Sequence, residues 1–428
     1  MQLNPGSKPR KSVRIQLGLA VTALLGTQVA SAEDTQIDSG VLLYNESGGR
    51  VSALEGVVLL SRRFTGDQNV QARFVYDALT GASPNGAIAS SQIQTFTRPS
   101  GAGNYQVNPG ETPLDDTFRD TRLAGSLTYD RPWFTDSKIT LGIQGSGEHD
   151  YVSVGGNLGY SRDLNKKNST ISLGLSAARD EITPEGGVPI PFAETVGIGR
   201  DQPREGSGDT KWVVDAVLGM TQVIDRTSLA RINYSLSSSS GYHTDPYKII
   251  SVVAPASSAT AGDPLRYLHE NRPDSRQKHS LFSQYRKRVK KTTLDVSYRF
   301  LWDTWGVASH TGELRYRIPV SSHYDVEPHI RYYHQSSADF HRLFLVDGES
   351  LPVETSADPR LGNMDAWTLG GKVGGFSIRG NEIAVTLEYY HQFLSSDDEA
   401  AAYGNLRTLD LTEDMNAFML RISHGWPD

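Results

Sequence analysis

Long segments of this chain alternate apolar and polar residues with a period of two. In residues 294–302 apolar side chains occupy every even position, and in residues 171–177 they occupy every odd position. Such alternation gives a β-strand one apolar face and one polar face. The segments run for about 11 to 15 residues, which exceeds the usual strand of a soluble protein and suits a tilted span of a bilayer.

Sixteen segments of this kind are expected to be antiparallel strands, and an even number is typical of single-chain bacterial barrels. They are residues 38–47, 51–64, 69–79, 117–130, 137–149, 150–162, 168–180, 209–225, 226–240, 277–290, 291–303, 308–320, 322–336, 363–378, 381–394 and 413–424. The long connections are the third, seventh, ninth, thirteenth and fifteenth, which are residues 80–116, 181–208, 241–276, 337–362 and 395–412. All five are odd, so the long loops lie at one end of the sheet and the tight turns at the other. The sequence therefore predicts an all-β fold, an antiparallel transmembrane β-barrel of about 16 strands with long extracellular loops and short periplasmic turns.

The N-terminus has the layout of a secretory signal peptide. A positive region that ends at Arg14 precedes a short apolar run at residues 15–26 and the small residues Ala30, Ser31 and Ala32. We expect residues 1–32 to be removed by cleavage after Ala32, and residues 33–428 to form a single barrel domain in the cell outer membrane. The chain contains no cysteine, which excludes c-type haem attachment, iron–sulfur clusters and thiolate zinc sites, so no cofactor is expected.

Charged residues in the middle of two neighbouring segments predict a charged wall inside the barrel, because their apolar neighbours face lipid. The residues of this wall are Glu313, Arg315, Arg317, Asp325, Glu327, His329 and Arg331. One strand register pairs Arg317 with Asp325 and Glu313 with His329; a slide of two residues pairs Arg317 with Glu327 and Glu313 with Arg331. Both registers place opposite charges across from each other. The wall either selects or binds ions, or is a structural ladder that keeps the lumen wall neutral. A metal site formed by His323 and His329 is less favoured, because they lie about 20 Å apart along a strand.

Aromatic residues are expected to form two girdles at the lipid–water interfaces, because Tyr and Trp have one apolar end and one polar end. Those at the loop ends of strands are Trp212, Trp302, Trp305, Trp367, Tyr389 and Phe393. Those nearer the turn ends are Trp133, Phe134, Phe418 and Trp426. An ordinary hydrophobic core is the alternative interpretation of the same residues.

Two stretches resemble one protein family. The first runs from Tyr44 to Val51 with the sequence YNESGGRV, and the second from Tyr76 to Gly86 with the sequence YDALTGASPNG. Together they resemble the start of an uncharacterised bacterial outer-membrane family, domain of unknown function 3570. The resemblance implies a barrel and no established activity. Members of that family tend to be encoded beside a periplasmic flavin transferase and small redox proteins, which implies a role beside extracytoplasmic electron transfer.

The second stretch enters the first long loop, and its notable residues are Tyr76, Asp77, Thr80, Gly81, Ser83 and Pro84. Asp77, Thr80 and Ser83 are candidates for a ligand or metal contact. We favour a loop-initiating turn, because Gly81 and Gly86 permit positive φ and Pro84 presets its own φ.

The sequence predicts a non-enzymatic, porin-like pore, or a membrane scaffold for a periplasmic or surface partner. Two alternatives stay open: a sheath or scaffold of an extracytoplasmic redox complex, and a barrel enzyme that acts on lipid or surface polymer. Hydrolase motifs such as G-x-S-x-G and H-E-x-x-H do not occur in the chain. The expected partners are outer-membrane lipid and lipopolysaccharide, with a periplasmic or surface redox protein as an alternative partner and no nucleic acid. A barrel this wide holds water or a plug, and the loops at 80–116 and 241–276 are long enough to constrict it.

Overall fold

A closed barrel of sixteen antiparallel strands forms the body of the molecule. The computed structural model describes residues 35–98, 103–115, 119–197, 200–378 and 381–425, so the predicted signal peptide and Trp426 lie outside the described residues. The barrel strands are β1 (Thr35–Glu46), β2 (Ser52–Phe64), β3 (Gln68–Thr80), β8 (Arg119–Pro132), β9 (Ser137–Gly147), β10 (Tyr151–Leu164), β11 (Ser169–Ile182), β14 (Asp209–Asp225), β15 (Ser228–Gly241), β18 (Ser275–Val289), β19 (Thr292–Asp303), β20 (Ala308–Pro319), β21 (Asp325–Gln335), β23 (Asn363–Ile378), β24 (Asn381–Ser395) and β25 (Met415–Gly425). Each pairs with the next in the chain, and β1 pairs with β25 to close the ring. The sixteen predicted strands are therefore confirmed, with ends that differ by a few residues.

The outer face of the barrel is apolar and exposed. Leu123, Ile143 and Val154 each leave 64–65% of their surface uncovered. Ser126 and Gln144, on the opposite faces of the same strands, line a hollow on the inner side. An apolar belt of this extent favours hydrocarbon over water, which is the arrangement of a membrane barrel.

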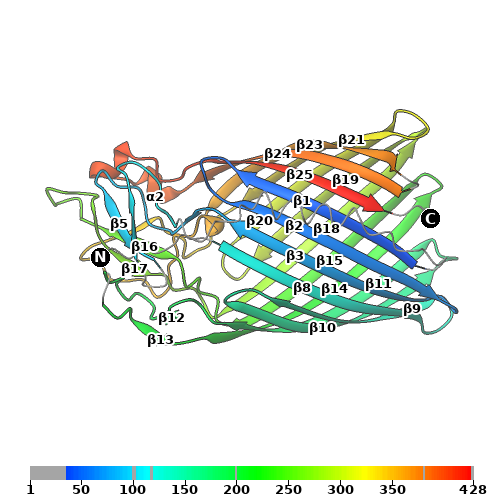
Figure 1. Ribbon diagram of the computed structural model, residues 1–428, viewed down its shortest axis with the longest axis horizontal. Coiled ribbons are helices and arrows are strands. Elements are labelled where there is room, and N and C mark those ends of the chain that lie inside the picture. Colours follow the sequence, from blue (N-terminus) through cyan, green and yellow to red (C-terminus); the bar gives the residue numbers. More distant parts are fainter. Residues whose placement is uncertain (1–34, 99–102, 116–118, 198–199, 379–380, 426–428) are drawn as a thin grey trace, which may run out of the picture.

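The five long connections all lie at one end of the barrel, together with short ones at 47–51, 148–150 and 304–307, and every connection at the other end is a tight turn (Figure 1). The prediction that all long connections share one end is therefore confirmed. We call the described residues of the five long connections (81–118, 183–208, 242–274, 336–362 and 396–414) the cap. Figure 1 shows that β5, β16 and β17 of the cap lie beyond the ends of the barrel strands.

The cap has its own secondary structure. Three two-stranded pairs are β4 (Ser83–Pro84) with β7 (Leu114–Asp115), β5 (Gln94–Thr97) with β6 (Asn104–Val107), and β12 (Val188–Pro189) with β13 (Arg204–Gly206). A three-stranded sheet joins β16 (Ile249–Val253) to β17 (Pro264–His269) and, in parallel, to β22 (Phe344–Val346). This sheet unites two different connections. The remaining elements are η1 (Pro359–Leu361), α2 (Asp397–Ala400) and η2 (Gly404–Thr408). None of the helices in the described residues is long and apolar enough to cross a membrane.

Most of the well-buried apolar side chains lie in the cap, although a few barrel residues such as Ala417 and Ala366 are buried as well. One cluster brings together Ile88, Val253, Phe344 and Leu406, which come from four different connections. In the barrel one strand face meets lipid and the other meets the lumen, so a water-excluding core has to form where loops pack on loops. The cap is therefore a packed layer.

Two of the predicted girdle positions are wrong. Trp305 was expected at the lipid interface, but it is only 4% exposed and packs against Phe340 in the cap. Phe418 was expected near the turn end, but it pairs in register with Tyr389 and Asn45, close to the cap end of the barrel. Trp305 follows β19 directly, where the chain already turns into a short connection, so it packs inward against the cap and not outward into lipid.

Candidate functional site

The cap crosses the mouth of the barrel from one side to the other. The connection after β3 leaves the third strand of the ring, and the connection after β15 leaves the ninth. These two connections nevertheless touch: the Ile249 amide donates to the Asn85 carbonyl at 2.9 Å, and the Ile88 amide donates to Ser251 Oγ at 3.2 Å. The Lys248 ammonium also donates to the Pro84 carbonyl. Segments rooted on opposite sides of the ring can meet only across the opening.

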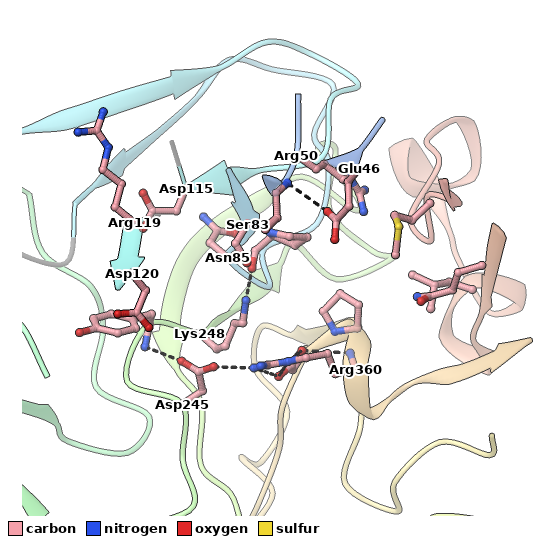
Figure 2. A pocket seen from close by; sticks show the side chains of 18 of the residues that line it. Glu46, Arg50, Ser83, Asn85, Asp115, Arg119, Asp120, Asp245, Lys248 and Arg360 are labelled. Carbon is pink, nitrogen blue, oxygen red and sulfur yellow. Dashed lines mark hydrogen bonds and ion pairs between the residues drawn. The ribbon is translucent and has the colours of Figure 1, made fainter. Parts of the chain in front are cut away.

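A chamber of about 660 Å³ lies between the cap and the ends of the barrel strands (Figure 2). Inward-facing strand residues form its lower wall, including Asp120 of β8, Gln392 of β24 and Met415 of β25. Ser83 and Lys248 are among the cap residues that line it. A solute that moves between the mouth and the lumen at this point has to pass through the chamber.

The chamber lining carries more negative than positive charge. Seven carboxylates face four cationic side chains: Glu46, Asp115, Asp120, Asp150, Glu185, Asp245 and Asp358 against Arg50, Arg119, Lys248 and Arg360. At neutral pH the lining is therefore electronegative.

A buried network of ion pairs holds the chamber wall in place. Arg272 lies 2.6 Å from a Glu270 carboxylate oxygen and 2.8 Å from an Asp358 oxygen, and both carboxylates are almost fully buried. Arg360 bridges Asp358 and Asp245 with contacts of 2.6 Å to each, and Figure 2 shows Asp245 and Arg360 side by side in the wall. The Ser356 hydroxyl donates to Glu270 at 2.5 Å. The network joins the connections before β18 and before β23.

Burial shifts the pKa values of the carboxyl groups in this network. Burial raises the pKa of Glu270 to about 7, although the neighbouring Arg272 lowers it. Burial also raises the pKa of Asp358, but Arg360, with Lys248 and Arg272, holds it well below its usual range. Asp358 is therefore the ionised centre of the network.

Carboxyl groups crowd together on the other side of the chamber. Tyr247 Oη donates to an Asp150 oxygen at 2.5 Å and accepts the Glu185 amide at 3.0 Å. Burial, together with a hydrogen bond to Asp120, raises the pKa of Glu148, in the connection after β9, to about 7. Glu148 therefore changes its charge near neutral pH.

The predicted charged wall lies on the inner face of β20 and β21. Its backbone register pairs Glu313 with Arg331 and Arg315 with His329, which is the second of the two predicted registers. The side chains instead meet along the diagonal. Arg317 contacts Asp325 at 2.8 and 3.0 Å, and His329 lies 3.2 Å from Glu313. Those are the partners of the first register, because long side chains reach two residues along the neighbouring strand.

One member of the wall was missed by sequence reasoning. Glu388 on β24 lies 2.7 Å from His329 Nδ1 on β21, although β23 runs between them. The intervening residue in register is Gly370, where a Cβ atom would lie 2.7 Å from Glu388 Cγ. Because Gly370 has no side chain, the Glu388 carboxylate can cross β23 at this point and reach His329. Whether the wall selects ions or is a structural ladder stays a prediction.

The family-like stretches come together at the mouth. Tyr76 is partly exposed on the outer face, whereas Asp77 points inward and pairs with Arg122 at 2.6 Å. Thr80 ends β3, and the next residue, Gly81, has φ +141°; a Cβ atom there would lie 2.4 Å from the Arg50 carbonyl oxygen. The second stretch thus packs on the first. Ser83 and Pro84 line the chamber. A ligand-contact role for Asp77, Thr80 and Ser83 stays a prediction.

Most of the chamber residues contributed by the cap were not found from the sequence. Asp245, Lys248 and Arg360 lie in long connections without periodicity, so no pattern marked them. The apolar run Ile249–Val253 was the available signal, because a short apolar run bounded by polar residues is typical of a buried strand. Within the described residues, no cluster of three or more His, Asp or Glu side chains has the arrangement of a metal site.

A family model described as a protein of unknown function (DUF3570) matches residues 15–426. A search of curated proteins found no match.

Several solved structures of outer-membrane proteins are similar at low identity. A bacterial polysaccharide outer membrane secretin is 8% identical with a TM-score of 0.45, covering 93% of this chain and 100% of that one. The TodX ΔS2S3 mutant, a monoaromatic hydrocarbon channel, is 9% identical with a TM-score of 0.42 and 94% coverage of both chains. The siderophore receptor PirA from Acinetobacter baumannii is 8% identical with a TM-score of 0.41 over 85% of this chain. This chain covers 53% of that receptor.

Proposed function

This chain belongs to the DUF3570 family of proteins of unknown function, and we propose from its structure that it is a non-enzymatic, porin-like pore of the outer membrane. The observation that carries the proposal is the chamber of about 660 Å³ at the lumen mouth, which strand ends and cap enclose together. Solutes would enter through the cap, pass the chamber and continue along the polar lumen.

The width of the barrel supports this proposal. Side chains alone do not fill a sixteen-stranded barrel, and porins of this size contain an aqueous channel. The inner face carries polar side chains such as Gln284 and Asp295, which hydrogen-bond to each other at 2.8 Å. A hydrated wall of this kind suits small hydrophilic solutes.

The charge of the chamber supports a preference for cations. Seven carboxylates against four cationic groups give the lining an excess of negative charge. In a narrow, low-dielectric opening, rings of Asp and Glu attract cations and repel anions. We expect the pore to pass small cations and small zwitterionic solutes more readily than anions.

Single-channel recording of purified protein in planar bilayers tests the proposal. Discrete openings are expected, with a reversal potential in a KCl gradient that indicates a preference for K⁺. The double variant Asp120→Asn, Asp150→Asn should keep the openings and bring the K⁺/Cl⁻ permeability ratio closer to one. Asp67→Asn is the matched control, because it makes the same change in a tight turn at the opposite end and Asn tolerates its positive φ of 56°.

An absence of openings in protein that keeps its folded barrel would contradict the pore. An absence of openings together with a co-purifying partner protein would favour the membrane scaffold instead. Hydrolysis of lipid or surface polymer by the purified protein would favour the barrel enzyme.

A further inference from the structure

Four histidines lie on the lipid-facing surface, close to the cap end of the barrel, on the arc of strands from β18 to β24. They are His279 on β18, His310 on β20, His334 on β21 and His391 on β24. His310 and His334 are direct partners in register. The residues between the other members are aromatic or polar: Trp302 is the partner of His279, Asp365 of His334, and Trp367 of His391. We call these four side chains the imidazole band.

The band lies on the same face as the apolar belt. His279 is two residues from the exposed Leu281, and His391 is two residues from the exposed Tyr389. Phe300 stacks on His310 with ring centroids 4.9 Å apart, and Trp302 stacks on His279 at 5.1 Å. The rings therefore sit within an aromatic girdle, the level at which lipid headgroups meet the hydrocarbon.

All four histidines are held by the same ring nitrogen. Nδ1 lies 2.7 Å from Tyr234 Oη in His279 and 2.7 Å from Tyr298 Oη in His310. In His334 it lies 3.0 Å from Asp365 Oδ1, and in His391 it lies 2.6 Å from Asn416 Oδ1. No hydrogen bond to Nε2 of any of the four occurs within the described residues. One nitrogen fixes each ring and leaves the other available, which is how proteins orient imidazoles toward a ligand.

We propose that the imidazole band binds the phosphate groups of the glycolipid in the outer leaflet, the phosphorylated glucosamine headgroup of lipopolysaccharide. Nε2 donates a hydrogen bond to a phosphate oxygen when it carries the proton, and an imidazolium adds charge. The carboxylate in the row, Asp365, is already bonded to His334 and to the Tyr332 hydroxyl. Where Nδ1 accepts a tyrosine hydroxyl, as the geometry allows in His279 and His310, Nε2 carries the proton and faces outward as a donor. In His334 and His391, Nδ1 donates to an oxygen, so Nε2 is a donor only in the imidazolium form.

Outside the imidazole band, the barrel has a different surface near its cap end. There the outward residues are Leu123 on β8, Val152 on β10 and Trp212 on β14, which are 48–65% exposed. A uniform girdle would have the same chemistry all round. The restriction of the histidines to one arc indicates a localised lipid site, and this inference rests on an outer-membrane location but not on pore activity.

Native mass spectrometry of the detergent-purified protein tests the site, with bis-phosphorylated lipid A as the probe. The double variant His310→Phe, His334→Phe keeps the aromatic rings and removes the ring nitrogens. We expect it to bind lipid A about tenfold more weakly than the wild type. The control Trp212→Phe, on β14 outside the imidazole band, should bind as the wild type does. A heat-dependent shift on gels checks that each variant keeps its folded barrel.

Further probes distinguish a lipid phosphate from inorganic phosphate, and a bound lipid from a second copy of the chain. Lipid A without phosphates should bind weakly to wild type and variant alike, and inorganic phosphate at millimolar concentration should not displace bis-phosphorylated lipid A. Equal binding of phosphorylated and dephosphorylated lipid A would overturn the proposal, as would displacement by inorganic phosphate. Unchanged lipid binding together with loss of a dimer in the double variant would also overturn it, because the band would then be an interface between two copies.

Discussion

Gly86 lies where two cap segments rooted on opposite sides of the barrel pass each other. Its φ is +94°, and a Cβ atom there would lie 2.3 Å from the Ile249 carbonyl oxygen. We expect Gly86→Ala to separate the two segments and destabilise the cap by about 1–3 kcal/mol. Limited proteolysis of the cap in membranes measures this. Gly110→Ala is the control, because Gly110 also has a positive φ, of +79°, but a Cβ there meets nothing within 4 Å. Equal sensitivity of the two variants would refute the steric argument.

The raised pKa of Glu148 predicts a pH dependence of ion selectivity. Burial, with the hydrogen bond and charge of Asp120, raises this pKa to about 7, and Arg122 partly opposes the shift. Because the folded-state pKa lies above the usual value, Glu148 is neutral below about pH 7 and gains negative charge as the pH rises through that value. Cation preference should therefore increase between pH 6 and pH 8.

Reversal potentials measured across that pH range check this expectation. Glu148→Gln should remove the step and hold the selectivity at its low-pH value. Glu185→Gln removes a carboxylate that lines the chamber, so it should lower selectivity at every pH and keep the step. A step that persists in Glu148→Gln would assign the titration to another group.

Some residue contacts followed from the sequence, and others could not. Opposite charges on β20 and β21 were predicted to meet, because alternation places them on one face, and Arg317 does contact Asp325. The alternation could not distinguish the two registers of β20 and β21, because both pair opposite charges. The contact between Glu388 and His329 depends on the absence of a side chain at Gly370, on the strand between them, which no local periodicity reveals.

At the level of elements, the buried ion pairs determine whether the cap stays assembled. Arg272 is 9% exposed and pairs with two nearly inaccessible carboxylates, Glu270 and Asp358. Arg272→Met leaves both carboxylates in a water-poor site with one cation fewer. Removal of one partner from a buried ion pair lowers the free energy of unfolding by about 3–5 kcal/mol. We expect faster hydrogen exchange of the β16 amides and unchanged exchange in the barrel strands.

Arg266→Met is the matched control for this experiment. Arg266 also lies in the cap and pairs with Asp347 at 2.5 Å, but both side chains are about a third exposed, at 34% and 37%. A surface pair of this kind contributes about 0–1 kcal/mol. Similar exchange in the two variants would show that the buried network does not stabilise β16.

Barrel strands and cap strands differ in how far sequence predicts them. Each barrel strand has a lipid face and a lumen face, so alternation over a long segment marks it, and all sixteen were predicted. The strand β16 has no such contrast: Ile250, Ser251 and Val253 are all fully buried in the cap. A short apolar run such as that of β16 does not distinguish a strand from a buried helix or loop segment. The cap, and with it most of the chamber, therefore could not be assembled from the sequence.

The molecule as a whole has two stabilising layers with different physics. The barrel is stabilised by closed hydrogen bonding in a bilayer, and the cap by burial of apolar side chains away from water. Two such layers are not expected to unfold in a single step. We expect urea to unfold the cap of membrane-inserted protein at a lower concentration than it unfolds the barrel.

Tryptophan fluorescence separates the two transitions. Trp305 is buried in the cap, 4% exposed, whereas Trp212 is 53% exposed on the outer face of β14. The first transition should therefore be lost from the fluorescence of Trp305→Phe and kept in that of Trp212→Phe, while circular dichroism reports the loss of strands only in the second. If the pore is constricted by the cap, its conductance should rise across the first transition and not the second. A single transition seen by both probes would mean that cap and barrel stabilise each other as one unit.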